Sequence, residues 1–235
     1  VTIYDQFWTR DGEGIVRAFD VAGYHKEAEE SLDYFIYLLS HPEDKWSFFQ
    51  VKYEQLYRGL EAYHPTHDLP CTDSPVDDRG IFVYPFEPEK SFDCPGGEYD
   101  SNGHALRAFE KHFKITGNKA WLEKVYPYIK LGAEWIRDGR KLTKVMIDGQ
   151  KPGYYGLIQK GHHEAVSEFP GWDYHYEDNF VCLEGMLYAI EAAEALGRED
   201  DVAWMKAEYE DYRKCLKESL EKSMVKEGDT VGFPI

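Results

Sequence analysis

Three stretches of this sequence each contain two runs of apolar residues at helical spacing, and a glycine separates the two runs. The separating glycines are Gly23, Gly117 and Gly197. Apolar residues three and four positions apart lie on one face of a helix, and a glycine ends a helix because it adopts the left-handed backbone conformation without strain. The sequence therefore predicts three helical hairpins and an all-α fold.

The first hairpin is expected over residues 12–41. The first helix of the second hairpin is expected over residues 102–116. The third hairpin carries apolar residues at helical spacing on both sides of its glycine, at Phe180, Leu183, Leu187 and Ile190 and then at Val202, Met205, Tyr209, Tyr212 and Leu216. An acidic loop precedes each hairpin, and Asp11, Asp100 and Asp178 mark a repeat of about 80 to 90 residues. Stacked repeats of this kind bury one another's apolar faces, so residues 1–235 are expected to form one domain.

The segment between the first two hairpins is less regular. Residues 46–60 have the pattern of an irregular helix, and residues 62–97 form a long loop insertion rich in Pro, Asp and Gly. Loops of this length are usually functional or disordered. A functional loop is favoured here, and a surface excursion joined by a Cys71–Cys94 disulfide is the alternative. Strand-like alternation is scarce, with one short candidate at residues 144–147 before the turn-forming pair Asp148-Gly149.

The composition excludes some function classes. The formal charge is −17, from 44 acidic and 27 basic residues, which disfavours a nucleic-acid partner because such binding depends on clustered Lys and Arg. No run reaches the roughly 18 apolar residues of a membrane span, so no membrane association is expected. The N-terminal residues include neither an initiating Met nor a signal-like segment, which suggests an excised or processed chain. The compartment, cytoplasmic or secreted or periplasmic, stays open.

No known cofactor or metal motif is present. Cysteine and histidine spacings typical of zinc sites, glycine-rich phosphate loops, dinucleotide fingerprints and nucleophilic Ser or Cys arrangements are all missing from the sequence. Cys182 and Cys215 fall inside expected helices and are interpreted as small core residues. His162, His163 and Glu164 could bind a metal, but their spacing is nonspecific and no metal is expected. We predict a chain without a cofactor.

The first candidate site is the segment that leads into the first helix, residues 4–12. A carboxylate at the start of a helix is stabilised by unpaired backbone N–H groups and by the helix dipole, so Asp11 would remain ionised and accept hydrogen bonds from sugar hydroxyls. Trp8 and Arg10 are expected to contribute to the same substrate-binding surface. The alternative is that Asp11 is only an N-cap and Arg10 only a surface charge.

The second candidate site precedes the second hairpin, at residues 97–104. Asp100 or Ser101 could be the helix cap. Two carboxylates two residues apart, Glu98 and Asp100, are more than capping requires. Glu98 is therefore expected to face a ligand, and Asp100 could serve both purposes.

The third candidate site, residues 168–180, is the densest. Hydrolysis of a glycosidic bond needs a protonated carboxylic acid at the leaving oxygen and an ionised carboxylate near the attacked carbon or its water. Aromatic neighbours raise the pKa of one carboxyl group by excluding water. Asp173, Glu177 and Asp178 lie among such neighbours, namely Trp172, Tyr174 and Tyr176. Asp173 or Glu177 is predicted to be the general acid, and the alternative is that Asp178 caps the helix while the aromatic rings hold the loop to the core.

Further substrate contacts are assigned to the loops around this third segment. Trp172, Tyr174 and His175 come from the segment itself, and His163 comes from the polar and aromatic loop that precedes it. Rings with an apolar body and a polar edge suit a sugar ligand, although large cores also use Trp and Tyr near loops.

The ordered set of motifs resembles the six-hairpin glycosidases, the (α/α)6 barrels that include glucoamylase-like enzymes. Residues 8–11, Trp-Thr-Arg-Asp, resemble the Trp/Tyr–x–Arg–Asp segment of that group, and residues 98–108 resemble its Gln–x–Asp–Gly–x–Ala–Leu–Arg–Ala segment. Residues 172–180 are similar in spacing to its Trp–Glu–Glu…Phe segment. The resemblance implies an (α/α)6 toroid, here incomplete with about three to four hairpins and with long loops at one end.

Three departures from the family pattern affect the expected chemistry. Glu98 stands where the pattern has Gln, and Asp173 and Tyr174 stand where it has two glutamates. The usual position of the general acid therefore has no carboxylate, so Asp173 or Glu177 has taken that role or the activity differs. The resemblance implies further hairpins, where such families often place the base, and these are expected to lie outside this sequence. An incomplete arc would expose an apolar flank, which predicts self-association or association with the remainder of the barrel.

The leading function is hydrolysis of a glycosidic bond in an oligo- or polysaccharide by carboxylic acid and base catalysis, with inversion implied by the resemblance. The alternatives are another carbohydrate-active α/α barrel, either a polysaccharide lyase or a phosphorylase, and a noncatalytic carbohydrate-binding helical domain.

Overall fold

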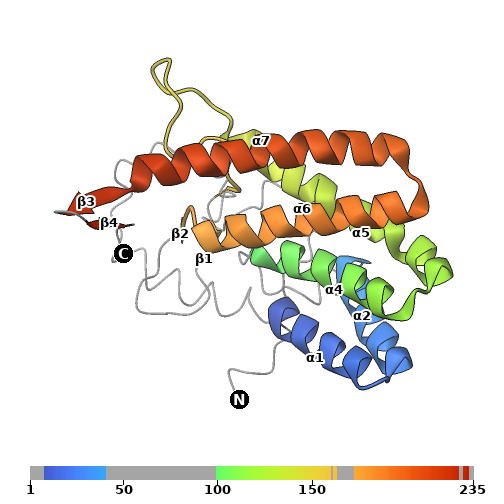
Figure 1. Cartoon of the computed structure of the whole chain (residues 1–235). Helices are drawn as coiled ribbons and strands as arrows, with labels where there is room; N and C mark the ends of the chain where they lie inside the picture. Colours follow the sequence, from blue (N-terminus) through green and yellow to red (C-terminus); the bar gives the residue numbers. More distant parts are fainter. Residues whose placement is uncertain (1–7, 41–98, 160, 163–171, 228–229, 233–235) are drawn as a thin grey trace, which may run out of the picture.

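The computed structural model describes residues 8–40, 99–159, 161–162, 172–227 and 230–232. The described chain is mostly helical (Figure 1). The irregular helix expected at 46–60, the loop at 62–97 and the Cys71–Cys94 pairing all lie outside the described residues. Cys182 and Cys215 lie buried within helices and form no disulfide, and the Cys182 thiol donates to the Tyr99 carbonyl at 3.1 Å, which confirms their interpretation as core residues.

The six helices of the described residues form three consecutive hairpins, as predicted. The first pairs α1 (Thr9–Val21) with α2 (His25–Ser40), the second pairs α4 (Asp100–Thr116) with α5 (Lys119–Thr143), and the third pairs α6 (Tyr176–Leu196) with α7 (Glu199–Ser223). The three separating glycines all have left-handed backbones, with φ of 86°, 63° and 68° in chain order. Gly117 also donates its backbone N–H to the Phe113 carbonyl at 2.7 Å, which satisfies an otherwise unpaired group at the end of α4.

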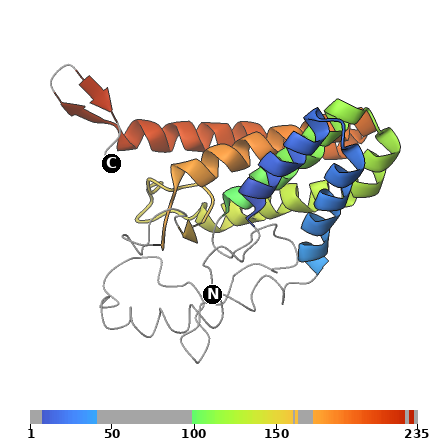
Figure 2. The same ribbon diagram turned by 90° about the horizontal axis from the view of Figure 1, so that it is seen from below.

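The first helices of the three hairpins lie side by side, with α4 between α1 and α6 (Figure 1). The second helices cover them: α2 packs on α1 and α4, α5 packs on α4 and α6, and α7 packs on α6. Figure 2 shows these helices from below, and α5 also contacts α7 through Tyr126 and Arg140. The three first helices all begin at the same end of the molecule.

Two glycines allow α4 and α6 to approach closely. A Cβ atom at Gly103 would lie 2.2 Å from the Val181 carbonyl oxygen, and one at Gly185 would lie 2.6 Å from the Gly103 Cα atom. Neither space can hold a side chain, so the two backbones are in direct contact.

The core lies between the two rows of helices. Phe35 of α2 packs edge-on against Phe109 of α4, and Tyr99 packs against Trp135 of α5 at a centroid distance of 5.3 Å. Each such ring contributes about 1.5 to 3 kcal/mol through burial. Because neighbours surround much of α4, several of its polar residues are buried as well as its apolar ones.

The short strands differ from expectation. Residues 144–147 were expected to form a strand, but they make only a single bridge, from Ile147 to Gln150, around the predicted turn at Asp148 and Gly149. The turn is confirmed and the strand is wrong. Two short antiparallel pairs were not expected: β1 (Gly161–His162) with β2 (Trp172–Asp173), and β3 (Val225–Glu227) with β4 (Thr230–Gly232).

Apolar side chains are exposed on the two outermost helices of the first row. Ile15 of α1 is 55% exposed, and Phe180 and Leu187 of α6 are 51% and 38% exposed. An exposed apolar flank was predicted, and association through it stays a prediction. Within the part of the chain that the structure describes, no helix combines the length and apolar character of a membrane span.

Candidate functional site

The leading ends of α1, α4 and α6 meet. Arg10, in the first turn of α1, forms a hydrogen-bonded ion pair with Asp100, the first residue of α4. The backbone N–H of Asp100 donates to Asp178 Oδ1, in the first turn of α6, at 3.3 Å. The leading ends of the first helices therefore converge in the three described hairpins.

The carboxylates at these ends do not cap their own helices in the expected way. The N-cap residues are Trp8, Tyr99 and His175, and none of them accepts a capping hydrogen bond through its side chain. Asp178 instead satisfies the first N–H of the neighbouring helix, α4. The interpretation of Asp178 or Asp100 as the cap of its own helix is wrong, because the helices approach closely enough for these side chains to bond across the interface.

A chain of alternating charges continues from Asp100 along α4. His104 places Nε2 at 3.4 Å from Asp100 Oδ2 and Nδ1 at 3.1 Å from Glu13 Oε2. Glu13 also pairs with Arg107, whose Nη1 donates to Glu184 Oε2 at 3.2 Å. We call the set from Arg10 to Glu184 the central polar network, with members Arg10, Asp100, His104, Glu13, Arg107 and Glu184.

The network favours the charged form of its members. Burial raises the pKa of Glu13, but hydrogen bonds from His104 and Arg107 outweigh burial and leave that pKa below its ordinary value. Burial lowers the pKa of His104, but hydrogen bonds to Asp100 and Glu13 outweigh it and raise that pKa. Glu13 and His104 therefore carry opposite charges over a wider pH range than either would alone.

Asp100 presents one oxygen to the network and keeps another apart from it. Oδ2 contacts Arg10 and His104, whereas Oδ1 is buried and has no hydrogen-bond partner within the described residues. A buried carboxylate oxygen is strongly stabilised when it accepts a hydrogen bond. Oδ1 therefore retains its capacity to accept a hydrogen bond.

The structure places the predicted residues of the first two sites as follows. Trp8 is partly exposed at the start of α1, and Asp11 is exposed in its first turn. Arg10 is 22% exposed at its side chain and pairs with Asp100, so its interpretation as a surface charge is wrong. Glu98 lies outside the described residues.

The residues of the third site are more scattered than expected. Trp172 and Asp173 form β2, and His163 lies outside the described residues. The Tyr174 ring stacks on Tyr154 at a centroid distance of 4.2 Å, and half-buried His175 is the N-cap of α6. Glu177 is exposed in the first turn of α6.

Among the described residues, aromatic side chains are therefore not seen to enclose Glu177 as expected. The Tyr176 hydroxyl is hydrogen-bonded to Ser219 at 2.9 Å and to Ser223 at 2.7 Å. These bonds direct Tyr176 toward α7. Glu177 is the next residue of the same helix and therefore faces a direction about 100° away. Exposure leaves Glu177 in contact with water rather than in a dry environment.

Four members of the central polar network were not predicted from the sequence: Glu13, His104, Arg107 and Glu184. A signal for them exists. Glu13 lies on the buried stripe of α1 with Val16, and Asp100, His104 and Arg107 follow one another at four- and three-residue steps. Charged residues at such positions are rarely buried unless they are paired.

A second polar cluster lies toward the opposite end of the first two hairpins. His112 is fully buried, with Nδ1 at 2.9 Å from Asp20 and Nε2 at 3.5 Å from Glu29. Its ring packs on Trp121 at 4.3 Å. These contacts join α4 to α1, α2 and α5, so the cluster is interpreted as structural. Among the described residues, no three His, Cys, Asp or Glu side chains are grouped to hold a metal ion.

The chain matches no family model, no curated protein and no solved structure. The likeness to six-hairpin glycosidases therefore depends on the sequence motifs alone. The chemistry has to be argued from the site itself.

Proposed function

We propose that this chain belongs to a glycoside hydrolase that binds its carbohydrate substrate at the leading ends of α1, α4 and α6. The observation that carries the proposal is the meeting of Arg10, Asp100 and Asp178 from three different helices. In the same proposal, the three hairpins are half of a six-hairpin toroid. The side-by-side arrangement of α1, α4 and α6 supports this toroid, because each first helix contacts the next in the same order along the chain.

Sugar recognition at this end has a physical basis. Hydroxyl groups need both donors and acceptors, and Arg10 supplies N–H donors while Asp100 Oδ1 supplies an acceptor. The partly exposed ring of Trp8 offers an apolar surface to a sugar face. The positive ends of three helix dipoles also favour the ionised form of the carboxylates gathered there.

Catalysis is assigned to Asp173 and Glu177, which lie just before α6 and in its first turn. One donates a proton to the leaving oxygen. The second, ionised carboxylate, which assists the attacking water, is not assigned to this pair. Since Glu177 is exposed, its burial by the bound substrate would be needed to raise its pKa.

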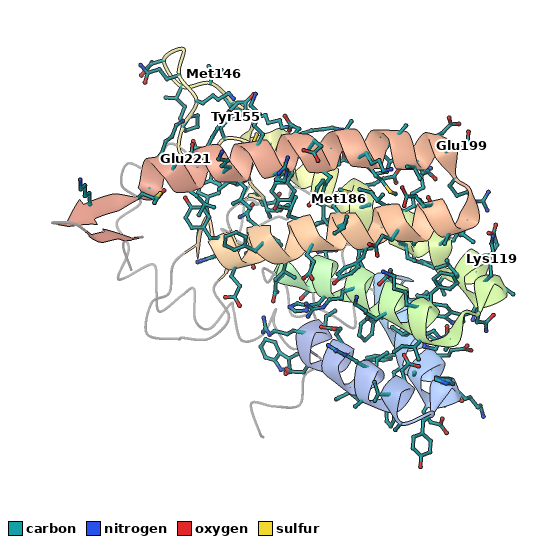
Figure 3. All side chains as sticks on the ribbon, in the orientation of Figure 1. Lys119, Met146, Tyr155, Met186, Glu199 and Glu221 are labelled. Atoms are coloured by element: carbon teal, nitrogen blue, oxygen red, sulfur yellow. The ribbon has the colours of Figure 1, made fainter. Side chains whose placement is uncertain are left out.

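The test is hydrolysis of maltotriose, cellotriose and xylotriose by the full-length protein, followed as new reducing ends. Replacing the general acid should lower kcat by about 100-fold or more, so either Asp173→Asn or Glu177→Gln should show this loss. Glu199→Gln is the matched control. Tyr176, the neighbour of Glu177, contacts the end of α7 that carries Glu221, whereas Glu199 lies at the opposite end of α7 (Figure 3). Unchanged rates in both Asp173→Asn and Glu177→Gln would contradict the catalytic assignment.

A noncatalytic carbohydrate-binding domain is the second candidate, and the exposure of Glu177 favours it. This candidate predicts sugar binding without turnover, whereas the hydrolase predicts a bell-shaped pH profile of kcat. A lyase acting on uronates or a phosphorylase would need cationic groups for an anionic substrate. The positive charges of Arg10 and Arg107 are already balanced by Asp100 and Glu13, which disfavours an anionic substrate.

A further inference from the structure

His104 is enclosed by charged groups on both sides of its ring. Nε2 faces Asp100 Oδ2 at 3.4 Å, and Asp100 is the only charged group recorded next to that nitrogen within the described residues. Nδ1 faces two groups of opposite charge: Glu13 Oε2 at 3.1 Å and Arg107 Nη2 at 3.0 Å. The side chain of His104 is 8% exposed, so these neighbours rather than water determine where its protons reside.

These contacts limit the ring to two arrangements. In the charged form, Nε2–H donates to Asp100 and Nδ1–H donates to Glu13. In the neutral form, Nδ1 can accept from Arg107 while Nε2–H still donates to Asp100. The other neutral tautomer would donate Nδ1–H to Glu13, but it would turn a bare Nε2 lone pair toward the Asp100 carboxylate and an N–H toward the N–H of Arg107. It therefore has one favourable contact and two repulsive ones, whereas the first neutral form has two favourable contacts and one repulsive contact, with Glu13.

We propose that His104 is a positioning residue that holds the Asp100 carboxylate through the same Nε2–H in both of its protonation states. Titration of the ring exchanges only the partner of Nδ1, from Glu13 in the charged form to Arg107 in the neutral form. Asp100 Oδ2 therefore stays occupied, and Oδ1 keeps its orientation as the pH changes. The role of Oδ1 as ligand acceptor rests on the proposed function, whereas the proton arrangement does not.

The charged groups of all three helices around the ring agree with this assignment. From α1, Glu13 faces the ring directly and Arg10 contacts it through Asp100. From α6, Glu184 holds Arg107, and Asp178 holds the backbone N–H of Asp100. Because Arg107 is held by Glu13 and Glu184 together, it remains next to Nδ1 when the ring loses its proton.

The first experiment reads the ring protons directly. Nitrogen NMR spectra of the full chain labelled with ¹⁵N-histidine are recorded from about pH 5 to pH 9, the range in which histidine titrates. The His104 signals are identified by their loss in His104→Gln. We expect Nε2 to remain of the protonated type throughout while Nδ1 changes. A deprotonated Nε2 at any pH in this range would overturn the proposal.

The second experiment compares two amide variants, His104→Gln and His104→Asn, in a titration with maltotriose, cellotriose and xylotriose. The amide nitrogen of the introduced glutamine can replace Nε2 and still donate to Asp100, whereas the shorter asparagine side chain places its amide nitrogen at the position of Nδ1 and cannot. We expect His104→Gln to retain affinity within about threefold and His104→Asn to lose about tenfold or more. Equal affinities for the two variants would overturn the positioning role. Failure of the wild-type chain to bind any of the sugars would contradict the proposed function, while the NMR result would still decide the proton arrangement.

Discussion

Glu13 illustrates how a single charged residue can be placed on a buried helix face. Its side chain is 7% exposed, and both His104 and Arg107 donate to it. Removing one member of a buried charged pair is costly because the partner stays buried without compensation. Glu13 is therefore expected to stabilise the contact between α1 and α4 and not only to carry charge.

Glu13→Gln tests this role through pH. Because the pKa of Glu13 is lowered in the folded chain, its stabilisation is present above its unfolded pKa of about 4.3 and is lost as the pH falls through the folded value. At neutral pH the variant should lose about 2 kcal/mol of unfolding free energy, and this difference should shrink below about pH 4. Urea unfolding at several pH values measures it.

Glu30→Gln is the control for Glu13→Gln. Glu30 forms an exposed pair with Lys26 at 3.5 Å, and exposed pairs contribute about 0.5 kcal/mol. A Glu13→Gln loss no larger than that of Glu30→Gln, or one that does not change with pH, would show that Glu13 has no such role.

At the level of single residues, the sequence predicted some members of the central polar network and missed others. Asp100 and Arg10 were found because each lies next to a predicted helix start. Glu13, His104 and Arg107 were missed because their partners are about 75 to 95 residues away or lie a helical turn along the same face, and pairing over that distance depends on tertiary contacts. The enclosure of Glu177 was predicted from aromatic neighbours in sequence, but Tyr176 faces α7.

At the scale of elements, the contact between α4 and α6 depends on two glycines. Replacing Gly103 with Ala would place a methyl group 2.2 Å from a backbone carbonyl oxygen, which no side-chain rotation can relieve. We expect Gly103→Ala to lower the unfolding free energy by about 3 kcal/mol, although alanine favours helices by about 1 kcal/mol over glycine. Thermal and urea unfolding measure the change.

Gly14→Ala is the matched control for Gly103→Ala. Gly14 lies within α1, is exposed, and has open space where a Cβ atom would be. We expect this variant to gain about 0.5 to 1 kcal/mol. If the Gly103→Ala and Gly14→Ala variants changed stability in the same direction, the close approach of α4 and α6 would be refuted.

Arg140 joins α5 to α7 and to the loop that follows α5. It is fully buried, its Nε donates to the Gly156 carbonyl at 2.7 Å, and its guanidinium pairs with Glu208 and Asp211. Arg140→Gln should lower the unfolding free energy by about 3 kcal/mol or more in urea titrations, because it leaves buried acceptors unpaired. Arg213→Gln removes an exposed pair with Glu210 and should lower the unfolding free energy by only about 0.5 kcal/mol. Equal losses of unfolding free energy in the two variants would contradict the role of Arg140.

Elements were predicted well where they were long. The helices on both sides of Gly23, Gly117 and Gly197 were found because periodic apolar residues and a left-handed glycine are both local signals. The pairs β1–β2 and β3–β4 were missed because strands of two or three residues contain too few positions to show alternation. The turn at Asp148 and Gly149 was found because its backbone preference is also local.

At the scale of the whole molecule, the two outer helices of the first row expose apolar side chains. Ile15 lies on α1, and Phe180 and Leu187 lie on α6. We expect the chain to show concentration-dependent association in sedimentation velocity, and the double change Phe180→Ser with Leu187→Ser should weaken it. A wild-type chain that remained monomeric at all concentrations would refute this expectation.

The central claim is that a carbohydrate binds where α1, α4 and α6 begin. Calorimetric titration of the full chain with maltotriose, cellotriose and xylotriose tests this claim most directly. We predict that at least one sugar binds and that Asp100→Asn lowers its affinity by about tenfold or more. Asp148→Asn, at an exposed turn, should bind as the wild-type chain does. Absence of binding to all three sugars, or equal affinity in Asp100→Asn, would contradict the claim.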